Sequence, residues 1–504
     1  MSYACHMTAS QLLAAIDLGS NSFRLEIGRL DHDQIQRVEY LKETVRLGSG
    51  LDEDRILSQT SMEKGWSCLA RFSERLQGIP PSQVRAVATQ TLREARNRDE
   101  FLSVGSQILG FPIEVISGME EGRLIYQGVS HLLPQSVERR LVIDIGGRST
   151  EVIAGVGYTP NQVASYRVGS VSSSIKHFKS GELSAQAFHK AEVAAQAILD
   201  DAWSQFPRSD WDIVYGASGT VGAVADVLNA SGWPASQITR EGLNWLTKCL
   251  LRAGHVDRIQ IDGLKEDRRA VIGGGISVLR AVMDVLGIDT IVVAQGALRQ
   301  GLLFDMLDRH VEAKDQREVS VRRLLHRFMV DQEQAQRVNQ VAQFFFAQLV
   351  KDAPQHEHLD AKRKLAWAAQ LHEIGSAISH ADHHKHGAYI IDHAEVFGFS
   401  DDELHRLGML ILGQKGKLRK LDADWSDERF CRLLLSLRLA IIVCHARTLP
   451  QVDALMLTQH AHRMSFTLTL PQGWAEQFPQ STHLLQLEQQ AWDKTSCSFE
   501  LLML

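Results

Sequence analysis

Two stretches of the chain share one pattern of apolar and polar positions, although they lie far apart in the sequence. The first is AAIDLGSNSFRLEIG at residues 14–28, and the second is LVIDIGGRSTEVIAG at residues 141–155. Each consists of an apolar run, an aspartate, a short turn of small polar residues and a second apolar run. Apolar runs bounded by turn residues predict a β-hairpin in each stretch.

The two turns carry groups that are suited to binding phosphate. Glycine lets the backbone approach a ligand closely and adopt positive φ, while hydroxyl and amide side chains add hydrogen-bond donors. The candidate residues are Gly19, Ser20, Asn21 and Ser22 in the first turn and Gly146, Gly147, Ser149 and Thr150 in the second. Ordinary turn chemistry explains either hairpin alone equally well. The recurrence of the pattern favours two phosphate-binding turns that face each other.

A carboxylate ends the first strand of each hairpin. Asp17 and Asp144 would repel a phosphate group unless a cation lay between them. We therefore expect Mg²⁺ or another divalent cation at these aspartates, held in part through water.

Alternating strand and helix patterns surround both hairpins. Met62, Trp66, Leu69, Phe72 and Leu76 fall on one helical face. Further helices are predicted near residues 101–109, 185–203, 268–286 and 297–307, and strands near 84–88, 112–116, 212–215 and 290–294. The pattern indicates two duplicated α/β domains, residues 1–133 and 134–313, with a cleft between them.

The remainder of the chain has a different pattern. Long helical stretches such as 319–350 and 361–378 predict a helical domain at residues 314–448. Strand-like segments at 454–457 and 464–470, followed by a polar helix, predict a small α/β domain at residues 449–504.

Composition narrows the class of protein. The chain has 504 residues, and single cores rarely exceed about 300 residues, so several domains are expected. A composition of 44% hydrophobic and 23% charged residues is typical of a soluble globular protein, and a net charge of −6 argues against a general nucleic-acid binder. The six cysteines form no CxxC pair, which favours reduced thiols; they are Cys5, Cys68, Cys249, Cys431, Cys444 and Cys497. With no long apolar run and no basic leader, we expect a cytoplasmic protein without a transmembrane segment, at most peripherally associated with a membrane.

Several segments together resemble the exopolyphosphatase and guanosine pentaphosphate phosphatase (Ppx/GppA) family. They are DLGSNSFRL, ATQTLREA, ISGMEEGRLIYQGV, DIGGRSTE, GASGT and GALRQGLLFDML, in that order. The resemblance covers essentially the whole chain. It implies duplicated actin-like, ribonuclease H-like ATPase-fold domains, with phosphate binding at both hairpins. It also implies that residues 216–220 lie where ATPases of this fold group hold adenosine, and that the protein is a homodimer.

The segment ISGMEEGRLIY separates a phosphatase from an ATP-driven kinase or chaperone of the same fold group. Ser117 and Glu120 have the spacing of a capping box, in which Glu120 bonds back to the backbone. The resemblance implies that Glu121 is the catalytic base, which would activate the water that attacks the terminal phosphorus. Without the resemblance, both glutamates are explained by the favourable dipole at a helix N-terminus.

The resemblance also assigns ligands for the transferred phosphate. It implies Mg²⁺ near Asp144 and Glu151, and phosphate contacts by Arg93 and Arg268. Arg148 departs from the family pattern, which has Gly or another small residue at this position. Either its backbone has positive φ and carries strain, or the guanidinium reaches a phosphate or crosses the cleft.

The helical region contains AAQLHEIGSAISHADHHKHGAYII, which resembles a histidine–aspartate (HD) phosphohydrolase domain. Arg337 stands where the upstream histidine ligand is expected, and Ser376 replaces the usual lysine, although the pair His372-Glu373 is present. The missing ligands favour a degenerate, structural HD-like domain over a second hydrolase, although His380, His383, His384 and His386 form a cluster.

A basic run guides the choice of substrate. Lys415, Lys417, Arg419 and Lys420 form either a solvated loop or a strip that holds a long anionic polymer. The strip favours inorganic polyphosphate, and hence an exopolyphosphatase. Guanosine pentaphosphate phosphatase is the close alternative, because RFMVDQEQAQRV and LTLPQGW resemble that branch of the family at least as well. A sensor that binds either ligand without turnover is the non-enzymatic alternative.

Overall fold

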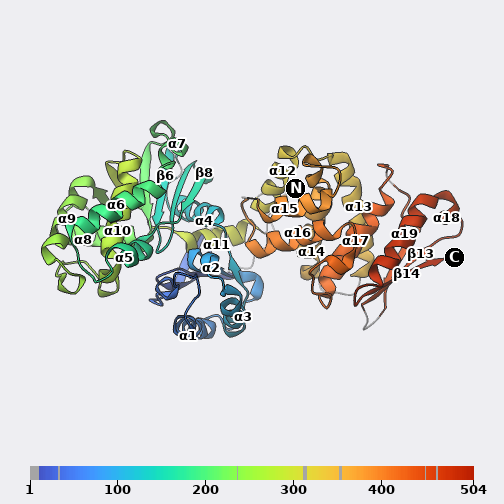
Figure 1. Ribbon diagram of the computed structural model, residues 1–504, viewed down its shortest axis with the longest axis horizontal. Helices are drawn as coiled ribbons and strands as arrows, with labels where there is room; N and C mark the ends of the chain where they lie inside the picture. The colour runs from blue at the N-terminus through green and yellow to red at the C-terminus, as the bar shows by residue number, and fades with distance from the viewer. Residues whose placement is uncertain are drawn as a thin grey trace. The chain divides into compact units, whose positions relative to one another are not determined.

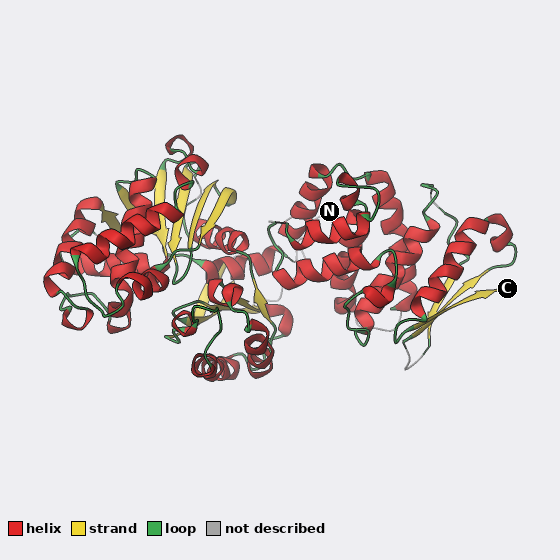
Figure 2. Ribbon diagram, viewed as in Figure 1, coloured by secondary structure: helices red, strands yellow, loops and turns green. Residues whose placement is uncertain are grey.

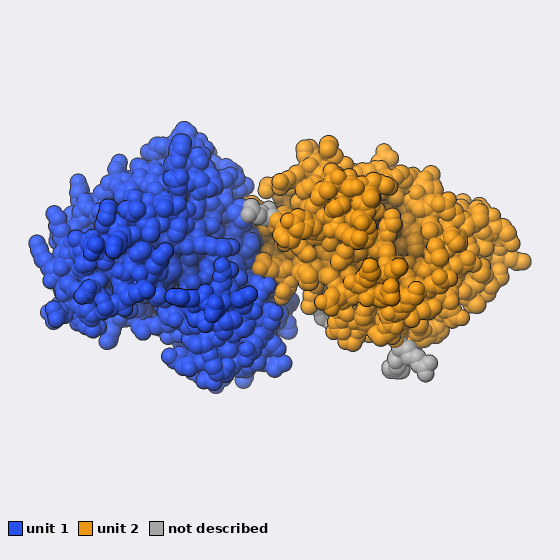
Figure 3. Space-filling view, viewed as in Figure 1, with its two compact units in different colours: residues 1–315 blue, residues 316–504 orange. Residues whose placement is uncertain are grey.

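The computed structural model describes residues 11–31, 34–134, 136–234, 236–309, 315–350, 355–394, 396–448, 450–460 and 464–504. The chain forms two compact units, residues 1–315 and 316–504, which Figure 3 shows in different colours. Each unit is described by itself. Cys5 and the N-terminal segment lie outside the described residues, and the other five cysteines are free thiols.

The first domain of unit 1 is built on a five-stranded sheet of order β3-β2-β1-β4-β5. The strands are β1 (Gln11–Leu18), β2 (Phe23–Asp31), β3 (Gln34–Glu43), β4 (Val84–Ala88) and β5 (Ile113–Val115). The first three are antiparallel neighbours, and β4 and β5 extend the sheet in parallel to β1. Helices α1 (Gln59–Arg75) and α3 (Arg98–Leu109) bury Leu69, Phe72 and Phe101 in the core of this domain.

The second domain repeats this topology. Its sheet has the order β10-β11-β9-β6-β7-β8. The strands are β6 (Arg139–Ile145), β7 (Thr150–Val156), β8 (Thr159–Tyr166), β9 (Ile213–Ala217), β10 (Gln237–Thr239) and β11 (Thr290–Val293). Without β10, the order β8-β7-β6-β9-β11 matches that of the first sheet, with the same three antiparallel strands followed by two parallel ones. The predicted duplication of actin-like domains is confirmed, and Figure 2 shows the two sheets in yellow.

Helices cover the second sheet and connect the two domains. Those of the second domain are α5 (Ser170–His177), α6 (Ala185–Ile198), α7 (Ala202–Gln205), α8 (Ser218–Ala230), α9 (Arg240–Ala253) and α10 (Glu266–Val285). Two more, α4 (Gly118–His131) and α11 (Leu298–Asp308), pack tightly against each other (Figure 1). Their close approach depends on glycine, because a Cβ on Gly128 or Gly301 would overlap the backbone of the opposite helix or its N-cap.

Unit 2 has a helical part and a small sheet that share one hydrophobic core. The helices are α12 (Gln316–Arg327), α13 (Gln332–Leu349), α14 (Gln355–Leu371), α15 (His383–Asp392), α16 (Asp401–Gly413) and α17 (Glu428–Val443). The sheet β12 (Met456–Gln459), β13 (Ser465–Leu470) and β14 (Ser498–Met503) packs with α18 (Trp474–Gln477) and α19 (Pro479–Trp492). The core runs from Leu434 of α17 to Phe466 and Trp492. Across the described residues, no helix is long and apolar enough to cross a membrane.

Three predicted helical stretches are interrupted, among them residues 361–378, which form the end of α14 and a 3₁₀ helix at Ile374–Ala377. Residues 319–350 form α12 and α13, because Met329 has a φ of 50° and Asp331 then caps α13 by accepting a hydrogen bond from the Gln334 amide at 3.0 Å. Residues 185–203 form α6 and the start of α7. Local backbone and capping preferences therefore override the continuous apolar pattern.

The α4–α11 contact gives a stability prediction. Gly301→Ala should lower the free energy of unfolding by about 2 kcal/mol or more, since the new methyl group overlaps the Leu124 carbonyl and forces the helices apart. Gly222→Ala in α8 is the control, because its Cβ meets nothing within 4 Å among the described atoms and should stabilise by about 0.5 kcal/mol. Chemical denaturation measures both changes, and equal stability of the two variants would contradict the prediction.

Candidate active site

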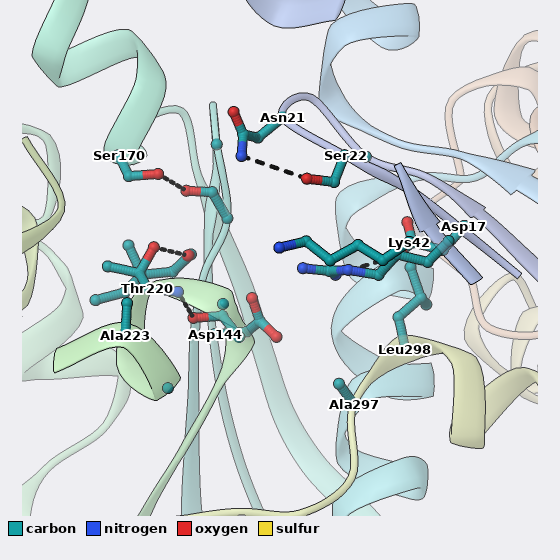
Figure 4. Close-up of a pocket in the computed structure, with 18 of the residues that line it drawn as sticks. Asp17, Asn21, Ser22, Lys42, Asp144, Ser170, Thr220, Ala223, Ala297 and Leu298 are labelled. Carbon is teal, nitrogen blue, oxygen red and sulfur yellow. Dashed lines mark hydrogen bonds and ion pairs between the residues drawn. The ribbon is translucent and has the colours of Figure 1, made fainter. Parts of the chain in front are cut away.

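A cleft between the two α/β domains contains both predicted turns. It encloses about 410 Å³ and is lined from both sides. Figure 4 shows that side chains of the first domain face those of the second: Asp17, Asn21, Ser22 and Lys42 on one side, and Asp144, Ser170, Thr220 and Ala223 on the other. The duplicated fold therefore brings the two turns to one cavity.

Backbone hydrogen bonds hold each turn in place. In the first turn, the Ser20 carbonyl accepts from the Gly48 amide at 2.8 Å, and the Asn21 carbonyl accepts from the Arg46 amide at 2.9 Å. In the second turn, the Gly147 carbonyl accepts from the Val171 amide at 2.7 Å. A Cβ on Gly147 would lie 2.8 Å from Ser20 Cβ, so the turns approach as closely as glycine allows.

The predicted residues divide into two groups by their place in the cleft. The described lining includes Asp17, Gly19, Ser20, Asn21, Ser22, Glu121, Asp144, Gly146, Gly147, Ser149 and Arg268. Arg93, Arg148, Thr150 and Glu151 lie outside this lining. The Thr150 hydroxyl donates to the Val168 carbonyl at 2.6 Å, so it supports the turn from behind.

Cross-strand register places acidic and basic residues differently in the two hairpins. Asp17 on β1 is the direct partner of Arg24 on β2, and their side chains pair at 3.3 Å. Asp144 on β6 is instead the direct partner of Glu151 on β7. Like charges opposite each other destabilise a sheet, so the second hairpin has a charge imbalance that the first does not.

Burial makes it costly for both carboxyl groups of this pair to be ionised. Burial, with the nearby Glu121 and Asp17 carboxylates, raises the pKa of Asp144 to about 7. Burial, Glu121 and Asp144 also raise the pKa of Glu151, which is fully buried. One Glu151 oxygen accepts from the Ser165 hydroxyl at 2.8 Å, and the other has no hydrogen-bond partner among the described residues. The pair has the chemistry of a site for a hard cation.

The described residues contain no group of three or more His, Cys, Asp or Glu side chains arranged to enclose a metal ion. Mg²⁺ commonly binds through one or two carboxylates and completes its shell with water and phosphate oxygens. Asp144 and Glu151 fit that mode of binding.

Glu121 lies at the N-terminus of α4, where the Ser117 hydroxyl accepts from the Glu120 amide at 3.1 Å. Its carboxylate accepts from Arg93 Nη1 at 2.8 Å, and the same nitrogen donates to the Ile116 carbonyl at 2.8 Å. Burial raises the pKa of Glu121 despite the opposing effect of Arg93. Arg93 therefore orients Glu121 in this structure.

The predicted capping role of Glu120 is wrong in one respect. Its two carboxylate oxygens accept from Arg123 at 2.7 and 2.8 Å, so the side chain points along the helix rather than back to the Ser117 amide. Arg123 also forms an ion pair with Asp305, and all three side chains are buried. A buried counter-ion competes successfully with the helix terminus for the carboxylate.

The cleft also contains several cations that were not predicted from the sequence, in addition to Arg268: Arg24, Lys42, Lys265 and Arg299. Arg24 is also the register partner of Lys42 on β3, so Asp17, Arg24 and Lys42 share one row of the sheet. Burial and the neighbouring Arg24 lower the pKa of Arg268, which indicates that cations are crowded here. The hairpin pattern contained the signal for Arg24, since a four-residue turn places it opposite Asp17.

Arg148 reaches across the cleft. It is not among the described non-glycine residues with positive φ, so the strain alternative does not apply. Its Nε donates to Glu94 at 2.9 Å, and its Nη1 donates to the Gly48 carbonyl at 3.0 Å. Both partners belong to the first domain.

The predicted features of unit 2 are described separately from the cleft. Lys415, Lys417, Arg419 and Lys420 are exposed around the short 3₁₀ helix at Leu418–Lys420. His372 is buried and bonds to the Ala369 carbonyl at 2.7 Å. Arg337, which stands at the expected ligand position, pairs with Gln334 and Glu333. The HD-like character of this unit stays a prediction.

Comparisons with known proteins agree with the fold. The Ppx/GppA phosphatase family model matches residues 27–310, and the model for domain III of these phosphatases matches residues 316–489. The chain therefore belongs to the Ppx/GppA phosphatase family, a family of hydrolases.

Several solved structures are similar to about three fifths of this chain. An exopolyphosphatase-like protein is 25% identical, with a TM-score of 0.54, over 59% of this chain and 98% of its own. An exopolyphosphatase from Cytophaga hutchinsonii is 24% identical, with a TM-score of 0.53, over 59% of this chain and 98% of its own. The Aquifex aeolicus family member is 23% identical, with a TM-score of 0.50, over 60% of this chain and 99% of its own. The latter two similarities bear on the fold alone.

The raised pKa of Asp144 predicts how stability depends on pH when no divalent cation is present. Its pKa is about 7 in the folded protein against 3.8 ordinarily, so between these values the native state holds a proton that the unfolded state has lost. The free energy of unfolding therefore falls as pH rises from about 4 to about 7. In EDTA, Asp144→Asn should raise this free energy at pH 8 by on the order of 2 kcal/mol and leave it nearly unchanged at pH 4.

Asp212→Asn is the matched control with the opposite sign. The hydrogen bonds from Arg139 lower the pKa of Asp212 to about 2, so its ionised form stabilises the fold above the ordinary pKa. This variant should lose stability at pH 8. Thermal unfolding at both pH values checks the pair, and a destabilised Asp144→Asn at pH 8 would contradict the prediction.

Proposed function

We propose that the protein removes the terminal phosphate of inorganic polyphosphate by metal-assisted hydrolysis, with Glu121 as the general base. The observation that carries the proposal is the position of Glu121. This buried carboxylate lines the cleft that contains both glycine-rich turns, and Arg93 holds it at 2.8 Å. A base in that position can orient a water molecule for in-line attack on a phosphate held by the turns.

The surrounding charges support phosphoryl transfer. A raised pKa makes Glu121 a better proton acceptor than an exposed glutamate. Negative charge on the equatorial oxygens is met by Arg24, Lys42 and Arg268 and by the donors of the two turns. Fixed donors of this kind act in a partly enclosed cleft without reorganising during the reaction.

Asp144 and Glu151 would hold the divalent cation. Their positions as cross-strand partners, the raised pKa of both groups and the Glu151 oxygen that lacks a hydrogen-bond partner among the described residues support this assignment. When bound, Mg²⁺ would neutralise charge on the phosphate oxygens. Asp17 is already paired with Arg24, so it is the weaker candidate ligand.

Guanosine pentaphosphate is the second candidate substrate, and the shape of the cleft favours it. Beyond the turns, the cleft continues along α8 past Gly219, Gly222, Ala223 and Asp226. Gly222 and Ala223 give this wall of the cleft small side chains, and a Cβ on Gly222 would meet nothing within 4 Å among the described atoms. A nucleoside needs such a wall, whereas inorganic polyphosphate does not.

Glu121→Gln tests the base. We expect kcat to fall by a factor of about 10² to 10⁴, because the amide cannot accept the proton, while the dissociation constant for substrate changes little. Phosphate release and equilibrium binding provide the two measurements. Glu43→Gln, which removes an exposed ion pair with Arg71, is the control. A Glu121→Gln enzyme that retains most of its kcat would exclude Glu121 as the base.

A side-by-side assay of phosphate release identifies the substrate. If long-chain polyphosphate is preferred, its kcat/KM should exceed that of guanosine pentaphosphate and remain within about twofold in Gly222→Leu. If guanosine pentaphosphate is preferred, Gly222→Leu should lower its kcat/KM about tenfold or more by occupying the wall along α8. Binding of both ligands without phosphate release would instead identify a sensor.

A further inference from the structure

We propose that Arg148 is a positioning residue for Glu121, acting through a chain of side-chain hydrogen bonds that crosses the cleft. This inference rests on the proposed role of Glu121 as the base. It concerns a residue outside the described lining of the cleft, at the position where the chain departs from the family pattern.

The hydrogen-bond chain has four links. Arg148 Nε donates to Glu94 Oε2 at 2.9 Å, and its Nη2 lies 2.8 Å from the same oxygen. The other Glu94 oxygen accepts from Gln90 Nε2 at 2.6 Å. Gln90 Oε1 then accepts from Arg93 Nε at 2.9 Å and Nη2 at 2.7 Å. Arg93 Nη1 finally donates to Glu121 at 2.8 Å.

Gln90 makes the chain directional. Its amide nitrogen can only donate and its amide oxygen can only accept. A flipped amide would place its oxygen against the Glu94 carboxylate and its nitrogen against the Arg93 guanidinium, which is unfavourable at both ends. Because Gln90 is buried, water cannot readily replace a lost partner. The orientation of Arg93 therefore depends on Glu94, and Glu94 is fixed by Arg148.

The three residues that link Arg148 to Glu121 lie on one short helix. Helix α2 (Gln90–Glu94) carries Gln90, Arg93 and Glu94 and follows directly after β4. A helix of this length has little stability of its own. Its position therefore depends on contacts from outside, and Arg148 supplies one from the opposite domain.

A second hydrogen bond of Arg148 connects it to the first turn through Gly48. Its Nη1 donates to the Gly48 carbonyl at 3.0 Å, and the Gly48 amide donates to the Ser20 carbonyl at 2.8 Å. A Cβ on Gly48 would lie 3.1 Å from Arg148 Cδ, so the side chain packs closely over this glycine. One guanidinium in the second turn therefore contacts both Gly48, which holds the first turn, and Glu94, which leads to Glu121 through the hydrogen-bond chain. The approach of the two turns and the alignment of Glu121 are therefore coupled.

This role predicts a specific kinetic signature. Arg148→Ala should lower kcat about tenfold, because Arg93 is less well oriented, and should change KM by less than about threefold, because Arg148 does not line the cleft. Glu94→Gln should have a similar effect. The double variant should be no worse than the poorer single variant, since both substitutions break the same chain. Arg148→Lys, which retains a charge toward Glu94, should recover part of the lost kcat.

Arg139→Ala is the matched control. It removes an exposed ion pair with Asp212 in the second domain and should leave kcat and KM within about twofold of the parent. Thermal unfolding verifies that all variants are folded. A wild-type kcat in Arg148→Ala would overturn the proposal, as would losses in the double variant that equal the product of the two single losses. A rise in KM alone would also overturn it, because that result would indicate direct substrate binding.

The Glu121→Gln variant separates this proposal from the proposed function. If Glu121→Gln retains activity, the base assignment fails, and with it the purpose of the chain. If Glu121→Gln is inactive while Arg148→Ala has the parent kcat, Glu121 stands as the base and only the positioning role is overturned. Loss of kcat in both variants, with the non-additive double variant, supports both.

Discussion

The site depends on one pair of like charges. Asp144 and Glu151 are direct cross-strand partners in a buried hairpin, whereas the equivalent position of the first hairpin pairs Asp17 with Arg24. Two neighbouring carboxylates in a buried sheet are costly unless a proton or a cation compensates them. This cost is the physical reason for which we propose a divalent cation in the second domain.

A second buried network determines which glutamate of α4 faces the cleft. Glu120 pairs with Arg123, which also pairs with Asp305 of α11. These ion pairs are buried at the crossing of α4 and α11, so they fix the rotation of α4 about its axis. Glu121, one residue further along, then points toward Arg93 and the cavity. The packing of α4 on α11 and the orientation of the proposed base therefore have a common origin.

Periodicity and turn chemistry were sufficient to predict the hairpins, strands such as residues 84–88 and the duplication. These signals depend on only a few neighbouring residues, and the elements that they predict are present in the structure. The cations Arg24 and Lys42 were missed because their convergence depends on register across three strands. The hydrogen-bond partner of Arg148 could not be predicted either, since Glu94 lies in another domain and only the folded chain brings the two residues together. Contacts between residues that are far apart in the sequence can be identified only in the folded structure.

The two halves of the duplicated fold have come to hold different charges. In the first domain Asp17 is neutralised within its own hairpin, and that domain also supplies Arg93, Lys42 and Glu121. The second domain supplies an uncompensated acidic pair. Neither half alone combines the proposed base, the cations and the acidic pair proposed to hold the metal, so the proposed hydrolysis requires the two turns to be brought together. An arginine in the second turn that contacts the first domain is a direct physical means of making the site complete only when they meet.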